Sequence, residues 1–354
     1  MALVGCGKVA DDHLSEIRKL SNARVVAVCD LEPLMAEQVA VRYGVPAYYS
    51  DVDQMLEVEK ADVVHITTPP QSHLPLAIKA VDAGCHLYVE KPLAMNYPDA
   101  VKLIDYATSR NRKLTIGYTY FFDPAAVRMR QLVQQGILGE LVHIESLLGY
   151  DLAGPFGVPV LIDSNHWLHR LSGKLFHNVA DHLLNKIMEF MPEERPTVAA
   201  KAWQYSESDD AGFPDELRVL LTAKRVSAYA TVSSAARPIG HSLTIYGTKN
   251  TARLDLVGQT VTLLSSPFMP GAIGRLSPAF NQSWKFFKEG IGNTSRFARS
   301  KYHYFEGLNF LLSSFYESII HDSAVPIPYS LILSVSSVMD DVFSQLNVME
   351  QQPA

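Results

Sequence analysis

The stretch MALVGCGKVA at Met1–Ala10 decides the fold of the first part of the chain. A short apolar run leads directly into the pattern G-x-G-x-x-A, which is typical of the first strand–helix turn in a dinucleotide-binding domain. Gly5 allows the tight turn, Gly7 lets the backbone approach a pyrophosphate, and Ala10 lets the helix pack closely on the sheet. The N-terminus of that helix also offers unpaired N–H groups to phosphates. The pattern therefore predicts a nucleotide site, with an unrelated glycine-rich turn as the alternative.

The acidic residue Asp30 comes at the end of the next apolar run, Val25–Cys29. An acidic side chain about 20 residues beyond the glycine motif can accept a hydrogen bond from the 2′-hydroxyl of an adenine ribose, whereas it repels a 2′-phosphate. We therefore expect NAD as the cofactor in preference to NADP. The alternative is an ordinary aspartate at the end of a strand.

Short apolar runs alternate with helical patterns up to about residue 120. The runs are Ala2–Val4, Val25–Cys29, Val63–Thr67, Leu87–Val89 and Leu114–Ile116. Their β-branched residues are typical of parallel strands buried on both faces. Two helical patterns, Leu31–Tyr43 and Leu74–Ala83, each end at a glycine, which is a common helix stop. This alternation predicts an α/β class N-terminal Rossmann domain with a parallel sheet over residues 1–121.

From about Asp123 the pattern changes, and we expect a second, α+β domain over residues 122–354. Helices are expected at Pro124–Gln135, Lys174–Met191, Phe280–Lys288, Tyr302–His321 and Ser330–Leu346. Alternating segments predict strands at Val142–Leu148, Val198–Tyr205, Glu216–Thr222, Ser227–Ser233, Ser242–Gly247, Thr251–Leu256 and Thr260–Leu264. Strands that follow one another without helices between them indicate an open, mostly antiparallel sheet with one helical layer.

Composition and charge exclude several classes of protein. The 354 residues suffice for about two domains, and 47% apolar against 19% charged residues is unlike a disordered chain. The formal net charge of −6 argues against a nucleic-acid-coating protein, so no nucleic-acid partner is expected. No apolar run reaches the roughly 20 residues of a membrane span, and the N-terminal residues do not read as a signal peptide.

The three cysteines, Cys6, Cys29 and Cys85, form no CxxC pair. A sparse, odd set of cysteines indicates reduced thiols in a cytoplasmic protein, without a disulfide framework or a zinc knuckle. We interpret all three as small buried residues.

Two polar stretches follow expected strands, Thr67–His73 (TTPPQSH) and Glu90–Ala94 (EKPLA). The carboxyl ends of parallel strands form the ligand-binding edge of an open α/β sheet. Taken alone, the second stretch could also be a surface Glu–Lys pair before a loop proline.

The glycine motif, the pattern T-P-x-x-x-H ending at His73, the motif E-K-P at Glu90–Pro92 and the domain order together carry a resemblance. The chain resembles the glucose–fructose oxidoreductase / inositol 2-dehydrogenase (GFO/IDH/MocA) family of nicotinamide-dependent sugar and cyclitol oxidoreductases, over essentially its whole length. The resemblance implies that Lys91 lies between nicotinamide and substrate and hydrogen-bonds to the reacting hydroxyl. A cis Lys91–Pro92 bond is expected there. The expected cofactor-binding residues are Gly5, Gly7, Lys8, Val9, Asp30, Thr67, Thr68, Pro69, His73, Glu90 and Lys91.

The family also carries a D-x-x-x-H pair on a helix that faces the lysine. The matching stretch here is Asn178–His182 (NVADH), so His182 fits the family histidine and Asn178 replaces the aspartate. An amide orients a hydroxyl but takes no proton, which leaves His182 as the proton acceptor, with Lys91, His182 and Asn178 as the catalytic set. Asp181 points roughly 100° away around the helix and could pair with His177. A satisfied core histidine is the alternative for His182.

A histidine-rich segment, with His166, His169, His177 and His182, raises the alternative of a metal site. No cysteine joins these residues and their spacing fits no standard zinc pattern, so no metal is predicted. We interpret the segment as a polar substrate wall, in which the fork of Arg170 suits a carboxylate or phosphate. With the family's tyrosines, the expected substrate-binding residues are Tyr118, Tyr120, His166, Trp167, Arg170 and Asp181.

The stretch Arg275–Lys301 contains six basic residues and one acidic residue, Glu289, with the aromatic residues Trp284, Phe286, Phe287 and Phe297 interleaved among them. A membrane-surface contact, a nucleotide-diphosphate clamp and a solvated face above core aromatics all remain open for it.

The residues and the resemblance together imply NAD(H)-dependent hydride transfer to or from a secondary alcohol of a sugar, a nucleotide sugar or a cyclitol. Arg170 and the basic stretch favour an anionic substrate. The resemblance also implies a homodimer or homotetramer that associates through the second domain's sheet. The alternatives are a nicotinamide-binding regulator without turnover and a related enzyme of trans-dihydrodiol dehydrogenase or biliverdin-reductase type.

Overall fold

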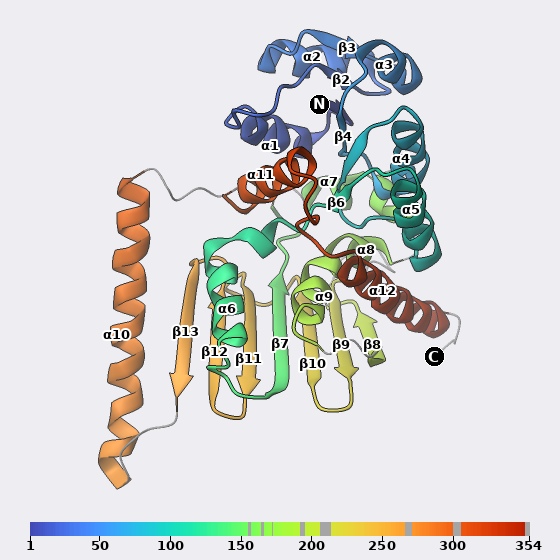
Figure 1. Ribbon diagram of the computed structural model, residues 1–354. Helices are drawn as coiled ribbons and strands as arrows, with labels where there is room; N and C mark the ends of the chain where they lie inside the picture. Colours follow the sequence, from blue (N-terminus) through green and yellow to red (C-terminus); the bar gives the residue numbers. More distant parts are fainter. Residues whose placement is uncertain are drawn as a thin grey trace. The chain divides into compact units, whose positions relative to one another are not determined.

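A computed structural model describes residues 1–154, 157–163, 166–171, 173–191, 195–205, 214–265, 271–299 and 306–350. The chain forms two compact units (Figure 1). The first unit comprises Met1–Thr119 and Gly307–Asp340, and the second comprises Tyr120–Glu306 and Asp341–Ala354. This division differs from the predicted single boundary after residue 121, because a C-terminal segment belongs to the first unit.

The first unit is built on a six-stranded, fully parallel sheet in the order β3-β2-β1-β4-β5-β6. Its strands are β1 (Ala2–Val4), β2 (Ala27–Cys29), β3 (Ala47–Tyr49), β4 (Val63–Ile66), β5 (His86–Val89) and β6 (Leu114–Ile116). Strand order reverses direction between β1 and β4, and ligands bind open α/β sheets at the carboxyl ends of strands beside such a switch point. The predicted Rossmann fold is therefore confirmed.

Helices follow the strands of this sheet in alternation, as predicted. They are α1 (Lys8–Ile17), α2 (Pro33–Tyr43), α3 (Val52–Glu59), α4 (His73–Asp82) and α5 (Tyr97–Ser109), with a 3₁₀ turn η1 (Pro70–Ser72) before α4. Gly44 ends α2 in the left-handed region at φ 63°, and Gly84 follows α4 at φ 86°, as expected of helix-stop glycines. Asp51 caps α3 by accepting hydrogen bonds from the N–H groups of Asp53 and Gln54.

The C-terminal segment of the first unit contains α11 (Glu306–Ile320) and the first half of α12 (Tyr329–Glu350). One face of α11 is apolar and fully buried at Leu311, Leu312 and Phe315. Lys113 beside β6 donates hydrogen bonds to the carbonyl oxygens of Ser318 and Ser323, at 2.7 and 2.6 Å. Burial of this face explains why the segment joins the first unit rather than the second.

The second unit contains a seven-stranded sheet in the order β13-β12-β11-β7-β10-β9-β8. Its strands are β7 (Leu141–Gly149), β8 (Thr197–Trp203), β9 (Glu216–Thr222), β10 (Ser227–Ser233), β11 (His241–Gly247), β12 (Asn250–Asp255) and β13 (Thr260–Ser265). The pair β7–β10 is parallel and the other pairs are antiparallel, so the predicted mostly antiparallel sheet is confirmed.

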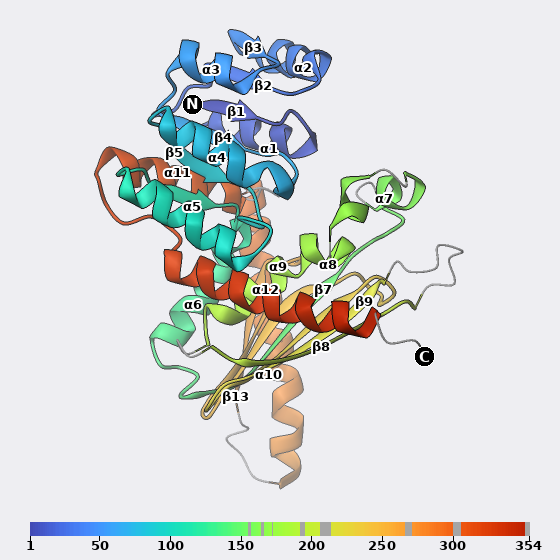
Figure 2. The same cartoon turned by 90° about the vertical axis from the view of Figure 1, so that its right-hand side faces the viewer.

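The helical elements of the second unit are η2 (Thr119–Phe122), α6 (Pro124–Gln134), α7 (Val158–Ile162), η3 (Trp167–Arg170), α8 (Lys174–Val179), α9 (Asp181–Met188) and α10 (Gly271–Ala298). α8 and α9 lie on one face of the sheet (Figure 2). They replace the single helix predicted at Lys174–Met191, and Ala180 between them keeps right-handed helical dihedrals, φ −63° and ψ −32°. α10 is much longer than the predicted Phe280–Lys288, because it continues through Pro278, Gly290 and Gly292.

Nowhere in the described ranges is there a helix with the length and apolar character that crossing a bilayer requires.

Candidate functional site

The glycine motif forms the turn between β1 and α1. Gly5 has φ +100°, and a Cβ on it would lie 2.8 Å from Thr68 Cγ2 and 2.9 Å from the carbonyl carbon of Thr67. A side chain is therefore excluded at Gly5 by both backbone and space. A Cβ on Gly7 would meet no protein atom within 4 Å, so the N-terminus of α1, with exposed Lys8 and Val9, is open to a ligand. This open turn fits the pyrophosphate of a dinucleotide.

Asp30 is held beside this turn by two backbone hydrogen bonds. Its Oδ2 accepts from the N–H of Cys6 at 2.7 Å, and its Oδ1 accepts from the N–H of Glu32 at 3.0 Å. Each carboxylate oxygen can accept a further hydrogen bond. The carboxylate is therefore fixed next to the glycine turn, as ribose recognition requires.

The three cysteines are buried thiols without disulfide partners. Burial raises the pKa of Cys6 to about 12, and those of Cys29 and Cys85 to about 11. These thiols stay protonated at neutral pH and serve as small packing residues.

The loop after β4 is fastened to the glycine turn. The hydroxyl of Thr67 donates to the carbonyl oxygen of Gly5 at 2.6 Å, and the Thr68 hydroxyl accepts from Ser72 at 2.7 Å. Pro69 is exposed, and its carbonyl oxygen accepts the N–H of Ser72. Thr67, Thr68 and Pro69 therefore lie in the loop that borders the glycine turn between β1 and α1.

His73 joins the loops that follow β4 and β5. It is fully buried, and its ring nitrogens lie 2.9 Å from the carbonyl oxygens of Thr68 and Pro92. Burial lowers the pKa of His73, so the ring is neutral near pH 7. Since no surface of His73 remains for a ligand, we assign it a positioning role in place of the cofactor contact expected from the sequence.

Glu90 and Lys91 lie at the carboxyl end of β5. Glu90 Oε1 lies 3.0 Å from His13 Nε2, and its Oε2 accepts the N–H of Lys91 at 3.2 Å. Burial on its own raises the pKa of Glu90, but His13 and Lys91 outweigh burial and bring that pKa below its usual value. The carboxylate covers Gly117, where a Cβ would lie 2.7 Å from Oε1. The half-buried Lys91 is followed by a cis peptide bond to Pro92, as predicted.

A buried chain of polar side chains that the sequence did not reveal ends at Glu90. His13 on α1 contacts His65 on β4 through their Nδ1 atoms at 2.9 Å, and His65 Nε2 lies 3.1 Å from the Tyr316 hydroxyl of α11. His65 also stacks on Tyr88, with ring centroids 4.7 Å apart. The sequence signal was a histidine in the otherwise apolar strand Val63–Ile66, but the partners lie far apart in the chain.

In the second unit, Asn178 and His182 are both half-buried, whereas Asp181 is 1% exposed. Their four-residue separation places Asn178 and His182 on one side across the α8–α9 junction. Asp181 turns inward and its Oδ1 accepts from Asn185 Nδ2 at 3.4 Å. Asp181 therefore lies on the buried side of α9, and the substrate contact expected of it stays a prediction.

A second cluster that sequence analysis missed surrounds Tyr120. Lys186, one helical turn after His182, donates to the carbonyl oxygen of His182 and lies within hydrogen-bond distance of His241 Nε2. The Tyr120 ring meets His182 and His241 edge-on, at 5.3 and 4.5 Å between centroids. Burial lowers the pKa of Lys186 to about 7, with Asp181 opposing the shift. Lys186 thus fixes the backbone that carries His182.

The other predicted substrate residues are dispersed. His166 accepts the N–H of Leu168 at 3.4 Å and lies beside the half-buried Trp167, while Arg170 is exposed. Burial lowers the pKa of His166. Tyr118 is 2% exposed, so its ring is a core residue and the expected substrate contact is not supported by its burial. Across the described ranges, no three His, Cys, Asp or Glu side chains form a group that could hold a metal ion.

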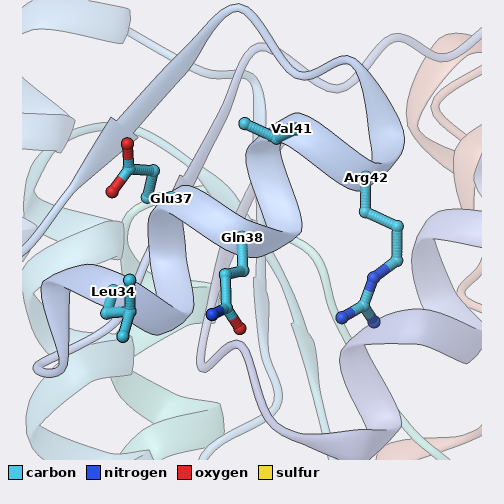
Figure 3. A pocket seen from close by; sticks show the side chains of 5 residues that line it. All are labelled: Leu34, Glu37, Gln38, Val41 and Arg42. Atoms are coloured by element: carbon cyan, nitrogen blue, oxygen red, sulfur yellow. The ribbon is translucent and has the colours of Figure 1, made fainter.

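Two surface hollows occur away from these residues. One, of about 490 Å³, is lined by side chains of the single helix α2 (Figure 3). One of these side chains, Arg42, forms an ion pair with Asp11 at 2.8 Å. The other, of about 620 Å³, lies between α6, α9 and the β9–β10 turn. Neither contains a residue of the predicted site.

Two family models match the chain. A model described as an oxidoreductase family with an NAD-binding Rossmann fold matches residues 1–118, and the GFO/IDH/MocA C-terminal domain model matches residues 126–253. The chain belongs to the GFO/IDH/MocA oxidoreductase family. The resemblance inferred from the sequence motifs is thereby confirmed.

The named relatives of this GFO/IDH/MocA protein include dehydrogenases of a glucoside and of inositol. It is 33% identical to the D-glucoside 3-dehydrogenase of Escherichia coli (strain K12) over 142 residues, which are 40% of each chain. It is 23% identical to the myo-inositol 2-dehydrogenase of Thermotoga maritima over 270 residues, 75% of this chain and 78% of that one. The match with the E. coli enzyme thus spans about two fifths of that enzyme's length.

Solved structures of the same fold cover almost the whole GFO/IDH/MocA chain. The WlbA dehydrogenase of Bordetella pertussis, in complex with NADH and UDP-GlcNAcA, has a TM-score of 0.76 at 18% identity and covers 97% of this chain and 94% of that one. The UDP-N-acetylglucosamine 3-dehydrogenase of Acidithiobacillus ferrooxidans has a TM-score of 0.74 at 18% identity, with 99% and 98% covered. At this identity the similarity establishes the fold alone.

Proposed function

We propose that the protein is an NAD-dependent dehydrogenase that oxidises a secondary alcohol of a sugar, a nucleotide sugar or a cyclitol, or reduces the corresponding ketone. The observation that carries the proposal is the Glu90–Lys91 pair at the end of β5, on the same sheet edge as the glycine turn and Asp30. His73 fastens the loops along that edge to one another. When bound, the nicotinamide accepts or returns the hydride, while the protein supplies orientation and electrostatics.

In this proposal Lys91 acts on the oxygen of the reacting carbon. Its ammonium group donates a hydrogen bond to that oxygen and stabilises the negative charge that develops as the proton leaves. We do not assign Glu90 as the base, because His13 and Lys91 hold the pKa of its carboxyl below the usual value and so make the carboxylate a weak proton acceptor. Its role is to hold the start of the loop that carries Lys91.

We assign the proton of the substrate hydroxyl to His182, since an imidazole can take and return a proton near neutral pH. Asn178, half-buried on the same side of the helix pair, orients the hydroxyl by hydrogen bonding. Lys186 holds the carbonyl oxygen of His182 and so maintains the position of the imidazole.

We propose an anionic substrate, such as a nucleotide sugar or a uronic acid. The exposed guanidinium of Arg170 can bind two oxygens of a phosphate or carboxylate. A protein of the same fold was solved with UDP-GlcNAcA, which supports this class. Asp30 beside the glycine turn supports NAD rather than NADP.

The test is the absorbance of reduced nicotinamide after mixing the protein with NAD⁺ and a panel of cyclitols, free sugars, uronic acids and nucleotide sugars. We expect reduction with one class, a loss of about 10²-fold or more in Lys91→Ala and His182→Ala, and little change in the exposed control Lys201→Ala. Equal rates in the wild type and Lys91→Ala would overturn the proposed role of Lys91.

A regulatory protein that binds NAD without turnover is the second candidate, and Asn178 is the observation that favours it. An amide in the place of the family's carboxylate cannot carry a charge or take a proton. Calorimetric binding of NAD together with no reduction across the whole panel would support this candidate against the dehydrogenase.

We further propose a homodimer or homotetramer that associates through the face of the seven-stranded sheet opposite α8 and α9. Tyr229 and Leu220 lie directly opposite one another on β10 and β9, and both are exposed. An exposed aromatic–aliphatic pair on an open sheet supports such a contact. Light scattering after size exclusion should show a mass that falls toward one chain in Tyr229→Lys, and a monomeric wild type would contradict the proposal.

A further inference from the structure

The long helix α10 lies beside β13, the edge strand of the seven-stranded sheet (Figure 1). Polar side chains of α10 contact this edge of the sheet and the neighbouring helix α6. Lys285 donates to the carbonyl oxygen of Leu263, Glu289 forms an ion pair with Arg128 at 2.6 Å, and Asn293 donates to the carbonyl oxygen of Gly258 at 2.8 Å. Since these three residues are four positions apart, they form one face of the helix.

The opposite face of α10 is an apolar stripe. It consists of Leu276, Phe280, Trp284, Phe287 and Ile291, spaced four, four, three and four residues apart, and each is 55–76% exposed. At 3.6 residues per turn the stripe is centred on the side away from Lys285, Glu289 and Asn293. The helix is thus oriented with its polar face toward the protein and its apolar face outward, the reverse of an ordinary surface helix.

Positive charge accompanies the stripe. Residues 271–299 contain five basic residues and one acidic residue, Glu289, which is engaged by Arg128. Two of the basic residues are engaged by the protein, because Lys285 lies on the polar face and Arg296 forms an ion pair with Glu306. Lys288 borders the stripe, with its ammonium 5.2 Å from the centre of the Trp284 ring. The helix is therefore a basic region in a chain whose formal net charge is −6.

We propose that this stripe binds the surface of a lipid bilayer rich in anionic phospholipid, with α10 lying flat in the headgroup region. Trp, Phe and Leu on one side of a helix, with a cation at the border of that side, are typical of interfacial helices, and anionic lipid attracts the ammonium group of Lys288 at the border of the stripe. Contiguous exposed apolar surface of this extent is rare in proteins without a binding partner. A second copy of the chain fits less well, because pairing two such stripes brings like charges together.

The experiment is co-sedimentation of the full-length protein with vesicles of phosphatidylcholine alone and of phosphatidylcholine mixed with phosphatidylglycerol. We expect binding to the anionic vesicles that falls with added salt, and at least tenfold weaker binding to neutral ones. The double variant Phe280→Ser/Phe287→Ser should lose at least tenfold in affinity for anionic vesicles, and Lys288→Glu several-fold. Leu31→Ser, at a 90% exposed apolar residue of the first unit, is the matched control and should bind as the wild type does.

Circular dichroism and the melting temperature check that each variant is folded, which we expect because the substituted side chains are mostly exposed. Absence of binding by the wild type, or equal binding by the double variant, would overturn the proposal. A concentration-dependent oligomer that the double variant abolishes, without vesicle binding by the wild type, would overturn it in favour of a second copy of the chain.

Discussion

At the scale of single residues, Gly5 and Gly7 form a matched pair with different physical constraints. Gly5→Ala should lower the free energy of unfolding by roughly 1–3 kcal/mol, because the methyl group meets Thr67 and Thr68 at positive φ. Gly7→Ala should leave stability within about 0.5 kcal/mol, because its methyl group meets no protein atom. Both variants should bind NAD at least tenfold more weakly than the wild type does, as measured by calorimetry. Wild-type affinity in Gly7→Ala would contradict the pyrophosphate site, since that methyl group would occupy the ligand's space.

Lys186 provides a prediction on pH dependence. Its pKa is about 7 in the folded protein against 10.5 for an unperturbed lysine, so between these values the unfolded chain holds the additional proton. The residue therefore makes the free energy of unfolding rise with pH, by up to about 1.4 kcal/mol per pH unit in that window. The free energy of unfolding of the wild type minus that of Lys186→Met should therefore rise from pH 7 upward and stay constant below pH 7.

Urea unfolding across that pH range measures this difference, and Lys201→Met, at an exposed lysine, is the control that should show no such slope. Parallel curves for wild type and Lys186→Met would mean that the ammonium group stays charged in the folded protein.

At the scale of elements, the chain from Tyr316 through His65 and His13 to Glu90 ties α11, β4, α1 and β5 together. His13→Leu removes the donor to Glu90 and should lower the free energy of unfolding by roughly 2–4 kcal/mol at neutral pH. Because the pKa of Glu90 is lowered, its contribution is present above about pH 4.5 and is lost as the pH falls through the folded-state pKa. The difference between wild type and variant should therefore shrink toward acid pH.

Unfolding of His13→Leu at several pH values checks this, with Tyr316→Phe as the control at the other end of the chain. That variant should lose only about 1 kcal/mol and keep the acid dependence of the wild type, since Glu90 retains His13. If the loss in free energy of unfolding in His13→Leu does not change with pH, then His13 does not stabilise the ionised form of Glu90.

The elements also show what sequence patterns can predict. Five of the six strands of the first sheet could be predicted, because a strand buried on both faces must be an apolar run. The ends of α2 and α4 could be predicted because Gly44 and Gly84, which stop these helices, are visible in the sequence. β3 was not predicted, because it is a half-exposed edge strand of three residues and has no continuous apolar run. The length of α10 was not predicted, because glycine and proline residues, such as those within this helix, usually interrupt a helix.

The candidate site divides in the same way. The glycine turn and the E-K-P motif combine special residue types at fixed spacing, so local sequence predicts their positions. The pairs His13–Glu90 and Lys186–His241 join residues that are distant in sequence, and a histidine or lysine alone does not show what it will contact. The burial of His73 and Asp181 likewise depends on the packing of loops and helices, which no local pattern reveals.

At the scale of the whole molecule, the return of Gly307–Asp340 to the first unit links the C-terminal part of the chain to the nucleotide-binding fold. Phe315 is fully buried in that segment, so Phe315→Ala should lower the free energy of unfolding by roughly 3–5 kcal/mol. Phe310, on the same helix but 47% exposed, is the control, and its alanine variant should lose less than about 1 kcal/mol.

NAD at a hundred times its Kd should raise the free energy of unfolding of Phe315→Ala by about 2.7 kcal/mol. The reason is that NAD binds only the folded first unit, and so stabilises every segment that unfolds together with that unit. Calorimetric melting with and without NAD measures both effects, and a Phe315→Ala transition that NAD does not raise would show that the segment folds independently of the nucleotide-binding sheet.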